Sequence, residues 1–160
     1  MFKSIVVGTD GSERASEAVL AAAELAATQP EAVLHIVTVQ KPLSGSAVAA
    51  GEMAAAAPVA AERSWEEEIK TELEDALAKA AETAMRVCDT RIETHARFGS
   101  PAEVLCDIAS HLQADLIVVG NKGMQGRRRV LGSVPNTVSH HAPCSVLIVD
   151  TAEDSGAADA

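Results

Sequence analysis

The 160-residue sequence contains very few aromatic side chains: they make up 2% of it, with one Trp, two Phe and no Tyr. Apolar residues nevertheless make up 48% and charged residues 22%, which is the balance of an ordinary globular protein and excludes collagen-like, mucin-like and wholly disordered chains. A chain of this length is about one domain and can bury roughly 70% of the surface that its unfolded form exposes. We therefore expect one core, filled by Val, Ile, Leu and Ala.

Cysteine and positive charge are also scarce. The three cysteines are odd in number and lack Cys-x-x-Cys spacing, which disfavours a disulfide framework or a zinc ribbon and fits a reducing cytoplasm. The net charge of −10 repels nucleic-acid phosphates and anionic lipid, so neither nucleic acid nor a membrane surface is an expected partner. No signal peptide fits the first residues, and breaks in the Ala-rich stretch 46–61 argue against a membrane span there. We expect a cytoplasmic protein.

Apolar runs of strand length alternate with helical patterns along the chain. This order predicts an α/β fold with a single doubly wound, mostly parallel five-stranded sheet and helices on both faces. The predicted strands are 4–8, 33–39, 91–98, 115–120 and 145–149. We expect one domain over residues 1–150, with a flexible Ala-rich insertion at 40–61 and a disordered acidic tail at 151–160.

Serine residues predict where three helices begin. Ser12 follows the first strand at the position of an N-cap, and the stretch Ser64-Trp65-Glu66-Glu67 has the pattern of a capping box. Ser100 gives the clearest signal, because Pro101 follows at the first helical position and a Glu stands three residues after the cap.

The segment from Gly120 to Ser133 carries the strongest indication of a binding site. In parallel sheets ligands bind beyond the carboxyl ends of the strands where strand order reverses, which indicates the loops after the first and fourth strands. Glycine lets the backbone approach a phosphate closely, and a helix that begins at Gly132-Ser133 attracts an anion through its free N–H groups. The only tight basic cluster, residues 127–129, lies in the same segment. These features predict a phosphate cradle, and the alternative is a flexible surface loop with solvated arginines.

Neither familiar nucleotide fingerprint is present. The sequence contains no G-x-x-x-x-G-K-S/T, and the loop after the first strand, Gly8 to Ser12, is not G-x-G-x-x-G. P-loop NTPases and dinucleotide-dependent dehydrogenases are therefore disfavoured.

Three stretches together resemble the universal stress proteins (the UspA family), in the order in which that family has them. They are Val7-Gly8-Thr9-Asp10-Gly11-Ser12, Gly99-Ser100-Pro101-Ala102, and the stretch from Val118 through Gly132-Ser133-Val134-Pro135 to Val149. The resemblance covers nearly the whole chain and implies a Rossmann-like adenine-nucleotide-binding fold. Nucleotide-binding members carry G-x2-G-x9-G-S/T after the fourth strand. This chain has the glycines, with eight residues between Gly123 and Gly132.

The resemblance implies a role for each residue that matches the family motif. Thr9 and Asp10 would lie beside the adenine and ribose, and the backbone of Val37 would bind the adenine edge. Two triplets would hold the rest of the nucleotide: Val119, Gly120 and Gly123 at the ribose and α-phosphate, and Gly132, Ser133 and Val134 at the phosphate chain. We add Arg127 as a phosphate contact because of its charge.

The implied function is that of a stress-response regulatory protein that binds an adenine nucleotide without efficient turnover. ATP, with Mg²⁺ as its counter-ion, is the first candidate ligand. Only Asp10 supplies a carboxylate near the site, whereas fast hydrolysis needs a well-held metal and a residue that orients water. The alternatives are a cyclic AMP-binding protein, a weak ATPase or self-phosphorylating protein with Ser133 as an acceptor, and a ligand-free dimerisation module. The resemblance also implies a homodimer through the last strand, whose apolar run 146–149 is expected at a sheet edge.

The histidines do not predict a metal site. His140 and His141 are adjacent on a predicted helix, so their side chains point about 100° apart and cannot easily share an ion. No spacing indicates a partner for His35, His95 or His111.

Overall fold

A five-stranded parallel sheet forms the middle layer of the molecule. The computed structural model describes residues 1–41, 59–121 and 132–151. Within these ranges, strands and helices alternate in the order β1 (Ser4–Thr9), α1 (Glu13–Ala27), β2 (Val33–Gln40), α3 (Val59–Met85), β3 (Arg91–Phe98), α4 (Pro101–His111), β4 (Leu116–Gly120), α5 (Ser133–His141) and β5 (Ser145–Val149). All strands pair in parallel in the order β3-β2-β1-β4-β5, which confirms the predicted doubly wound sheet.

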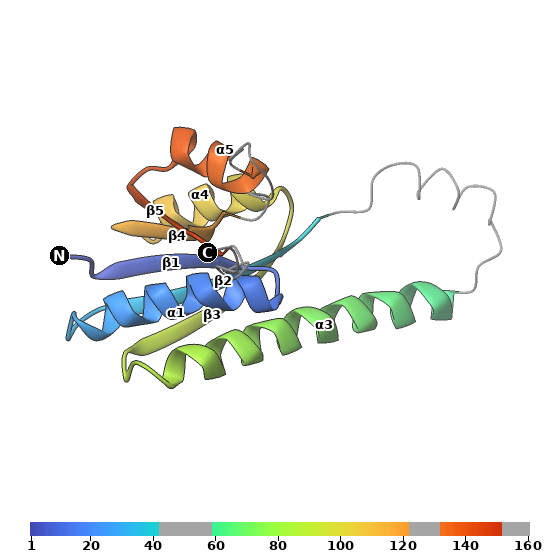
Figure 1. Cartoon of the computed structure of the whole chain (residues 1–160). Helices are drawn as coiled ribbons and strands as arrows, with labels where there is room; N and C mark the ends of the chain where they lie inside the picture. The colour runs from blue at the N-terminus through green and yellow to red at the C-terminus, as the bar shows by residue number, and fades with distance from the viewer. Residues whose placement is uncertain (42–58, 122–131, 152–160) are drawn as a thin grey trace, which may run out of the picture.

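Helices cover both faces of this sheet (Figure 1). Ile5 and Val7 of β1 belong to the core shared with α1 and α3, whereas Val6 between them belongs to the core shared with α4 and α5. This alternation follows from the pleat of a strand, which turns successive side chains to opposite faces. Both faces are buried, which is why the central strands are continuous apolar runs.

The core is aliphatic, as the composition predicts. Its largest fully buried side chains are Ile, Leu, Val and Pro, and no aromatic ring is among them. Helix α1 presents the sheet with a buried face of four alanines and one valine: Ala18, Val19, Ala22, Ala23 and Ala26. Side chains this small let the helix backbone lie close to the sheet, so the core is filled without large rings.

The helix starts agree only in part with the capping signals. The Ser12 side chain accepts a hydrogen bond from the backbone N–H of Ala15 at 3.2 Å. Helix α4 begins at Pro101 with Ser100 as its N-cap residue, as predicted, but the Ser100 side chain makes no capping hydrogen bond. The start predicted at Ser64 is wrong, because α3 begins at Val59. Alanine is the best helix former, and the Ala60-Ala61 pair extends the helix backwards past the serine.

The predicted insertion and tail fall mainly outside the described residues. Of the stretch 40–61, Gln40 belongs to β2 and residues 59–61 belong to α3, and 42–58 lie outside the described ranges. Thr151, the first residue of the predicted tail, is buried and hydrogen-bonded to Asn121. The structured chain therefore continues at least to Thr151, and residues 152–160 are not described.

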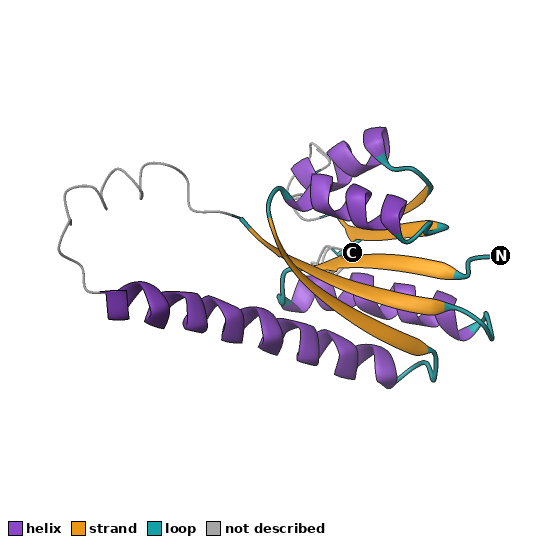
Figure 2. Ribbon diagram, turned by 180° about the vertical axis from the view of Figure 1, so that it is seen from behind, coloured by secondary structure: helices purple, strands orange, loops and turns teal. Residues whose placement is uncertain are grey.

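Helix α3 is longer than the strands and projects beyond their carboxyl ends (Figure 2). Among the side chains described for this helix, those of residues 67–85, the buried ones are Leu73, Leu77, Ala80 and Ala84. Among the helices in the described part of the chain, none combines the length and the apolar character that crossing a bilayer requires.

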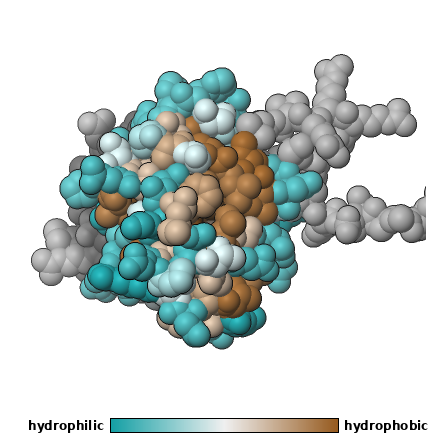
Figure 3. All heavy atoms as spheres, turned by 90° about the vertical axis from the view of Figure 1, so that its left-hand side faces the viewer, coloured by the Kyte–Doolittle hydropathy of each residue, from teal (hydrophilic) through white to brown (hydrophobic). Residues whose placement is uncertain are grey.

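The sheet has two open edges, β3 and β5, both as predicted. Most residues of β3 are exposed, whereas the apolar residues 146–149 of β5 are half-buried. Seen from the left of Figure 1, where the strands begin, the molecule has one main hydrophobic area and smaller ones among hydrophilic surface (Figure 3).

Asp115 ties the connection before β4 to the start of β1. Its Oδ2 accepts hydrogen bonds from the backbone N–H groups of Lys3 at 2.7 Å and Ser4 at 3.0 Å. These backbone donors, Ser4 first and then Lys3, hold the pKa of Asp115 below its ordinary value. The ionised carboxylate therefore stabilises the folded state more than the unfolded state.

We expect Asp115→Ala to lower the free energy of unfolding at pH 7 by about 1 kcal/mol, less than the roughly 1.5–3 kcal/mol of a hydrogen bond to a charged group, because solvent screens this site. A lowered folded pKa gives stability that is present above the unfolded pKa and is lost as the pH falls through the folded pKa. The difference in the free energy of unfolding between wild type and variant, measured by urea titration, should therefore shrink below about pH 4. A difference that is undiminished at pH 3 would contradict this role.

Candidate functional site

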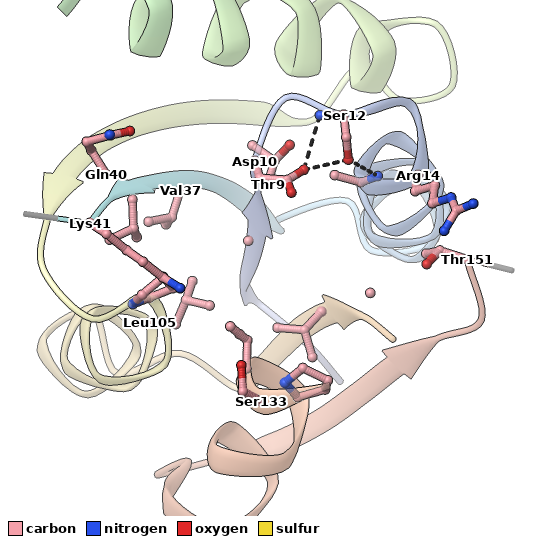
Figure 4. A pocket seen from close by; sticks show the side chains of 18 residues that line it. Thr9, Asp10, Ser12, Arg14, Val37, Gln40, Lys41, Leu105, Ser133 and Thr151 are labelled. Atoms are coloured by element: carbon pink, nitrogen blue, oxygen red, sulfur yellow. Dashed lines mark hydrogen bonds between the residues drawn. The ribbon is translucent and has the colours of Figure 1, made fainter. Parts of the chain in front are cut away.

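A cavity of about 480 Å³ opens beyond the carboxyl ends of β1, β2 and β4 (Figure 4). Strand β1 lies between β2 and β4 in the sheet. The chain adds β2 and β3 on one side of β1, and then β4 and β5 on the other side, so the strand order reverses at β1. Ligands of open parallel sheets bind at this kind of switch point, and the volume falls within the roughly 300–1,000 Å³ of small-molecule sites. The cavity thus lies where the sequence predicts the site.

One wall of the cavity is apolar. Val37 of β2, Val119 of β4 and Leu105 of α4 are all buried and line it. Val39, Pro101, Val134 and Pro135 also line the cavity. An apolar wall of this kind suits a flat ring that carries few polar groups.

The loop between β1 and α1 forms a second, polar wall that is held by its own hydrogen bonds. Asp10 Oδ1 accepts from the Ser12 N–H at 3.1 Å and from the Ser12 hydroxyl at 2.5 Å (Figure 4). Thr9 Oγ1 accepts from the Gly11 N–H at 3.2 Å, and Gly11 has a φ of +76°, a conformation that favours glycine. Because Ser12 also caps Ala15, the N-terminus of α1 already has a side-chain partner.

The N-terminus of α5 differs from that of α1. Gly132 is its N-cap residue, and no side chain in the described ranges caps its first turn. Its first residues, Ser133 and Val134, line the cavity, so this helix start lies at the cavity wall. The first N–H groups of a helix lack partners within the helix and carry partial positive charge, so a bound anion would satisfy them.

Two cationic side chains also line the cavity. Arg14 stands in the first turn of α1, and Lys41 directly follows β2 (Figure 4). Positive charge at a cavity in a chain of net charge −10 favours an anionic ligand over a neutral one. The sequence analysis did not select either residue. Lys41 could have been selected because it immediately follows a strand, and ligands of parallel sheets bind beyond the carboxyl ends of the strands.

Seven of the ten residues that the sequence analysis selects line the cavity: Thr9, Asp10, Val37, Val119, Gly120, Ser133 and Val134. Gly132 lies next to them as the N-cap residue of α5. Gly123 and Arg127 lie outside the described residues. The structure therefore brings residues from four separate parts of the chain to one cavity.

A buried polar clamp supports the cavity behind Gly120. Asn121 Oδ1 accepts hydrogen bonds from both the N–H and the hydroxyl of Thr151, each at 3.0 Å, and Asn121 Nδ2 donates to Asp150 Oδ1 at 2.8 Å. A Cβ added at Gly120 would lie 3.0 Å from Thr151 Cγ2, so this close approach requires glycine or a shift of the threonine. The clamp fixes the chain after β5 against the end of β4, and Thr151 itself lines the cavity.

Comparison with known proteins identifies the family. Residues 1–150 match the model of the universal stress protein family. The chain belongs to this family. It is 35% identical to universal stress protein Rv1636 of Mycobacterium tuberculosis over 151 residues, which cover 94% of this chain and 97% of that protein.

Solved structures agree with this assignment. A universal stress protein in complex with cAMP is 32% identical, with a TM-score of 0.67, and the match covers 94% of this chain and 98% of the other. A universal stress protein from Archaeoglobus fulgidus in complex with dAMP is 21% identical, with a TM-score of 0.63 and coverage of 92% and 98%. At that identity the second likeness shows the shared fold alone.

Proposed function

We propose that this universal stress protein binds an adenine nucleotide in the cavity at the switch point. The base lies against the apolar wall, where the Val37 backbone binds its edge, and the phosphate lies at the N-terminus of α5. The observation that carries the proposal is the start of α5, which lies at the cavity wall without a side-chain cap in the described chain. The 32% identical protein in complex with cAMP supports the same class of ligand.

ATP, with Mg²⁺ as its counter-ion, is the first candidate. Arg14 and Lys41 line the cavity in addition to the start of α5, and a chain of three phosphates carries enough negative charge to use both cations. Cyclic AMP is the second candidate, because it is the ligand of the similar protein. A competition experiment, in which ATP and cyclic AMP displace each other from the site, measures which of the two binds more tightly.

We infer that bound ATP is not hydrolysed efficiently. Among the residues described around the cavity, Asp10 is the only one with a carboxylate, and its Oδ1 already accepts two hydrogen bonds from Ser12. Efficient hydrolysis needs a held metal and a residue that orients the attacking water. Phosphate release at about one per second, the lower end of typical turnover, would contradict this inference.

Ser133→Asp is expected to weaken nucleotide binding at least about tenfold, which corresponds to roughly 1.4 kcal/mol. Ser133 is the first residue of α5, so the new carboxylate would repel a phosphate placed there. An acidic residue in the first turn also stabilises a helix by about 0.3–1 kcal/mol, so the variant should fold. Calorimetric titration of nucleotide-free protein with ATP and with cyclic AMP measures the effect.

Ser139→Asp is the matched control for this experiment. It makes the same substitution in the same helix, at an exposed position about 9 Å further from the helix start. We expect its affinity to stay within about twofold of wild type, since Ser139 does not line the cavity. Equal losses in the two variants would show that net charge, and not the start of α5, controls binding.

We further propose that the protein forms a homodimer through β5 and acts as a regulatory protein in the cytoplasm. Strand β5 is a sheet edge with a half-buried apolar run at 146–149, and such edges tend to be covered. All three cysteines are free, which suits a reducing compartment. A monomeric mass in solution at micromolar concentration would contradict the dimer.

A further inference from the structure

Three side chains of metal-ligating type converge on β2 and β3, apart from the nucleotide cavity. We propose that His35, Glu93 and His95 form a binding site for a divalent transition-metal ion of the zinc type. Among the described residues, theirs is the group of such side chains whose ligand atoms lie close enough to share one ion, all within 4.8 Å of one another.

The parallel pairing of β2 with β3 creates this cluster. His35 is the register partner of Glu93, so the two side chains stand next to each other across the strands. His95 follows Glu93 by two residues, and residues i and i+2 of a strand point to the same face. All three side chains therefore project from one face of the sheet.

Two of the three distances between the ligand atoms are close to those around a tetrahedral ion, and the third, between Glu93 and His95, is at most 4.8 Å. His35 Nδ1 lies 3.2 Å from His95 Nε2 and 3.4 Å from Glu93 Oε2. With bonds of about 2.0–2.1 Å to zinc, two ligand atoms at a tetrahedral angle lie about 3.3 Å apart. Two imidazoles and one carboxylate form a common zinc ligand set and leave a fourth position for water or another ligand.

A neighbouring arginine orients the carboxylate ligand. The Arg91 guanidinium binds Glu93 Oε1 at 2.6 Å, which holds the carboxylate while Oε2 lies toward His35. A metal-ligating carboxylate is commonly oriented by such an outer partner. Arg97 is the other cation near the cluster, beside His95.

Burial lowers the pKa of both imidazoles. For His35 the carboxylate of Glu93 opposes this effect, and for His95 the charge of Arg97 adds to it. At neutral pH both rings are therefore in the neutral form that binds metals. His35 is buried, whereas Glu93 and His95 are half-buried, so an ion can reach the cluster from solvent.

The site is separate from the proposed nucleotide site. None of the three residues is among those that line the cavity, although Val37, two residues after His35 on the same face of β2, does line it. An ion here is therefore not the counter-ion of a bound nucleotide, and the proposal stands whether or not a nucleotide binds.

The test is a titration of chelator-treated full-length protein with Zn²⁺ by calorimetry and with Co²⁺ by visible absorption. Wild type should bind one Zn²⁺ at this site and give the strong visible bands of low-symmetry four- or five-coordinate Co²⁺. His95→Ala and Glu93→Gln should each weaken Zn²⁺ binding at least about tenfold and reduce the Co²⁺ bands. Both residues are half-buried, so circular dichroism should show that the variants stay folded.

His111→Ala is the matched control, because His111 is exposed and lies outside the cluster. Its Zn²⁺ affinity should equal that of wild type. The proposal is overturned if wild type shows no saturable Zn²⁺ binding, or if His95→Ala and Glu93→Gln bind Zn²⁺ as tightly as His111→Ala does. It is also overturned if binding disappears only when His140 and His141 are replaced together.

Discussion

Asn121→Ala is expected to lower the free energy of unfolding by about 2–4 kcal/mol. The Asn121 side chain is buried, and its Oδ1 accepts two hydrogen bonds from Thr151, which is also buried. Alanine removes the acceptor and leaves a buried N–H and a buried hydroxyl without it, each at a cost of roughly 1–3 kcal/mol. The loss is large because one side chain fastens the end of β4 to the chain that follows β5.

Urea unfolding at pH 7 measures this loss, with Asn136→Ala as the control. Asn136 is exposed on α5, so its replacement should change stability by no more than about 0.5 kcal/mol. Because Thr151 lines the cavity, Asn121→Ala should also weaken nucleotide binding. A stability change for Asn121→Ala as small as that of the control would show that the clamp does not hold the two strand ends.

Ala22→Leu is expected to destabilise the protein by about 1–3 kcal/mol, although it adds apolar surface to the core. Ala22 is fully buried in the core that α1 shares with α3 and the sheet, among other small residues. Interiors are packed to crystal-like density, so a leucine there must push the helix away from the sheet. Thermal unfolding measures the effect.

Ala27→Leu makes the same substitution on the same helix at an exposed position. It should shift the free energy of unfolding by no more than about 0.5 kcal/mol. A higher melting temperature for Ala22→Leu than for wild type would contradict an α1 held close to the sheet by its small residues.

The fold could be predicted because its determinants are local. Continuous apolar runs such as 116–119 indicate strands that are buried on both faces, and the crossover rule then leaves a parallel sheet with helices on both faces. The less apolar run 91–98 correctly indicated an edge strand. The start of α3 could not be placed, because the capping signal at Ser64 competed with the helix propensity of the alanines before it.

The residues alone predict the part of the site that lies within one segment, whereas Thr9, Asp10 and Val37, from other parts of the chain, follow only from the resemblance to the universal stress proteins. Gly120, Ser133 and their neighbours stand close together in the sequence, and their pattern indicates an anion site. Lys41 comes from a different loop and reaches the cavity only through the fold. The same holds for the cluster of His35 with Glu93 and His95, which depends on the register between β2 and β3. Only the spacing of Glu93 and His95, two residues apart on β3, could be recognised from the sequence alone.

The most direct test of the central claim, that an adenine nucleotide binds at the switch point, is a titration followed by backbone amide NMR. The 16.5 kDa chain is small enough for such spectra, also as the proposed homodimer of twice that mass. Adding ATP or cyclic AMP to nucleotide-free protein should give saturable shifts that are largest at Thr9, Val37, Ser133 and Val134. No saturable shift with either nucleotide, or shifts confined to the amino ends of the strands, would contradict the claim.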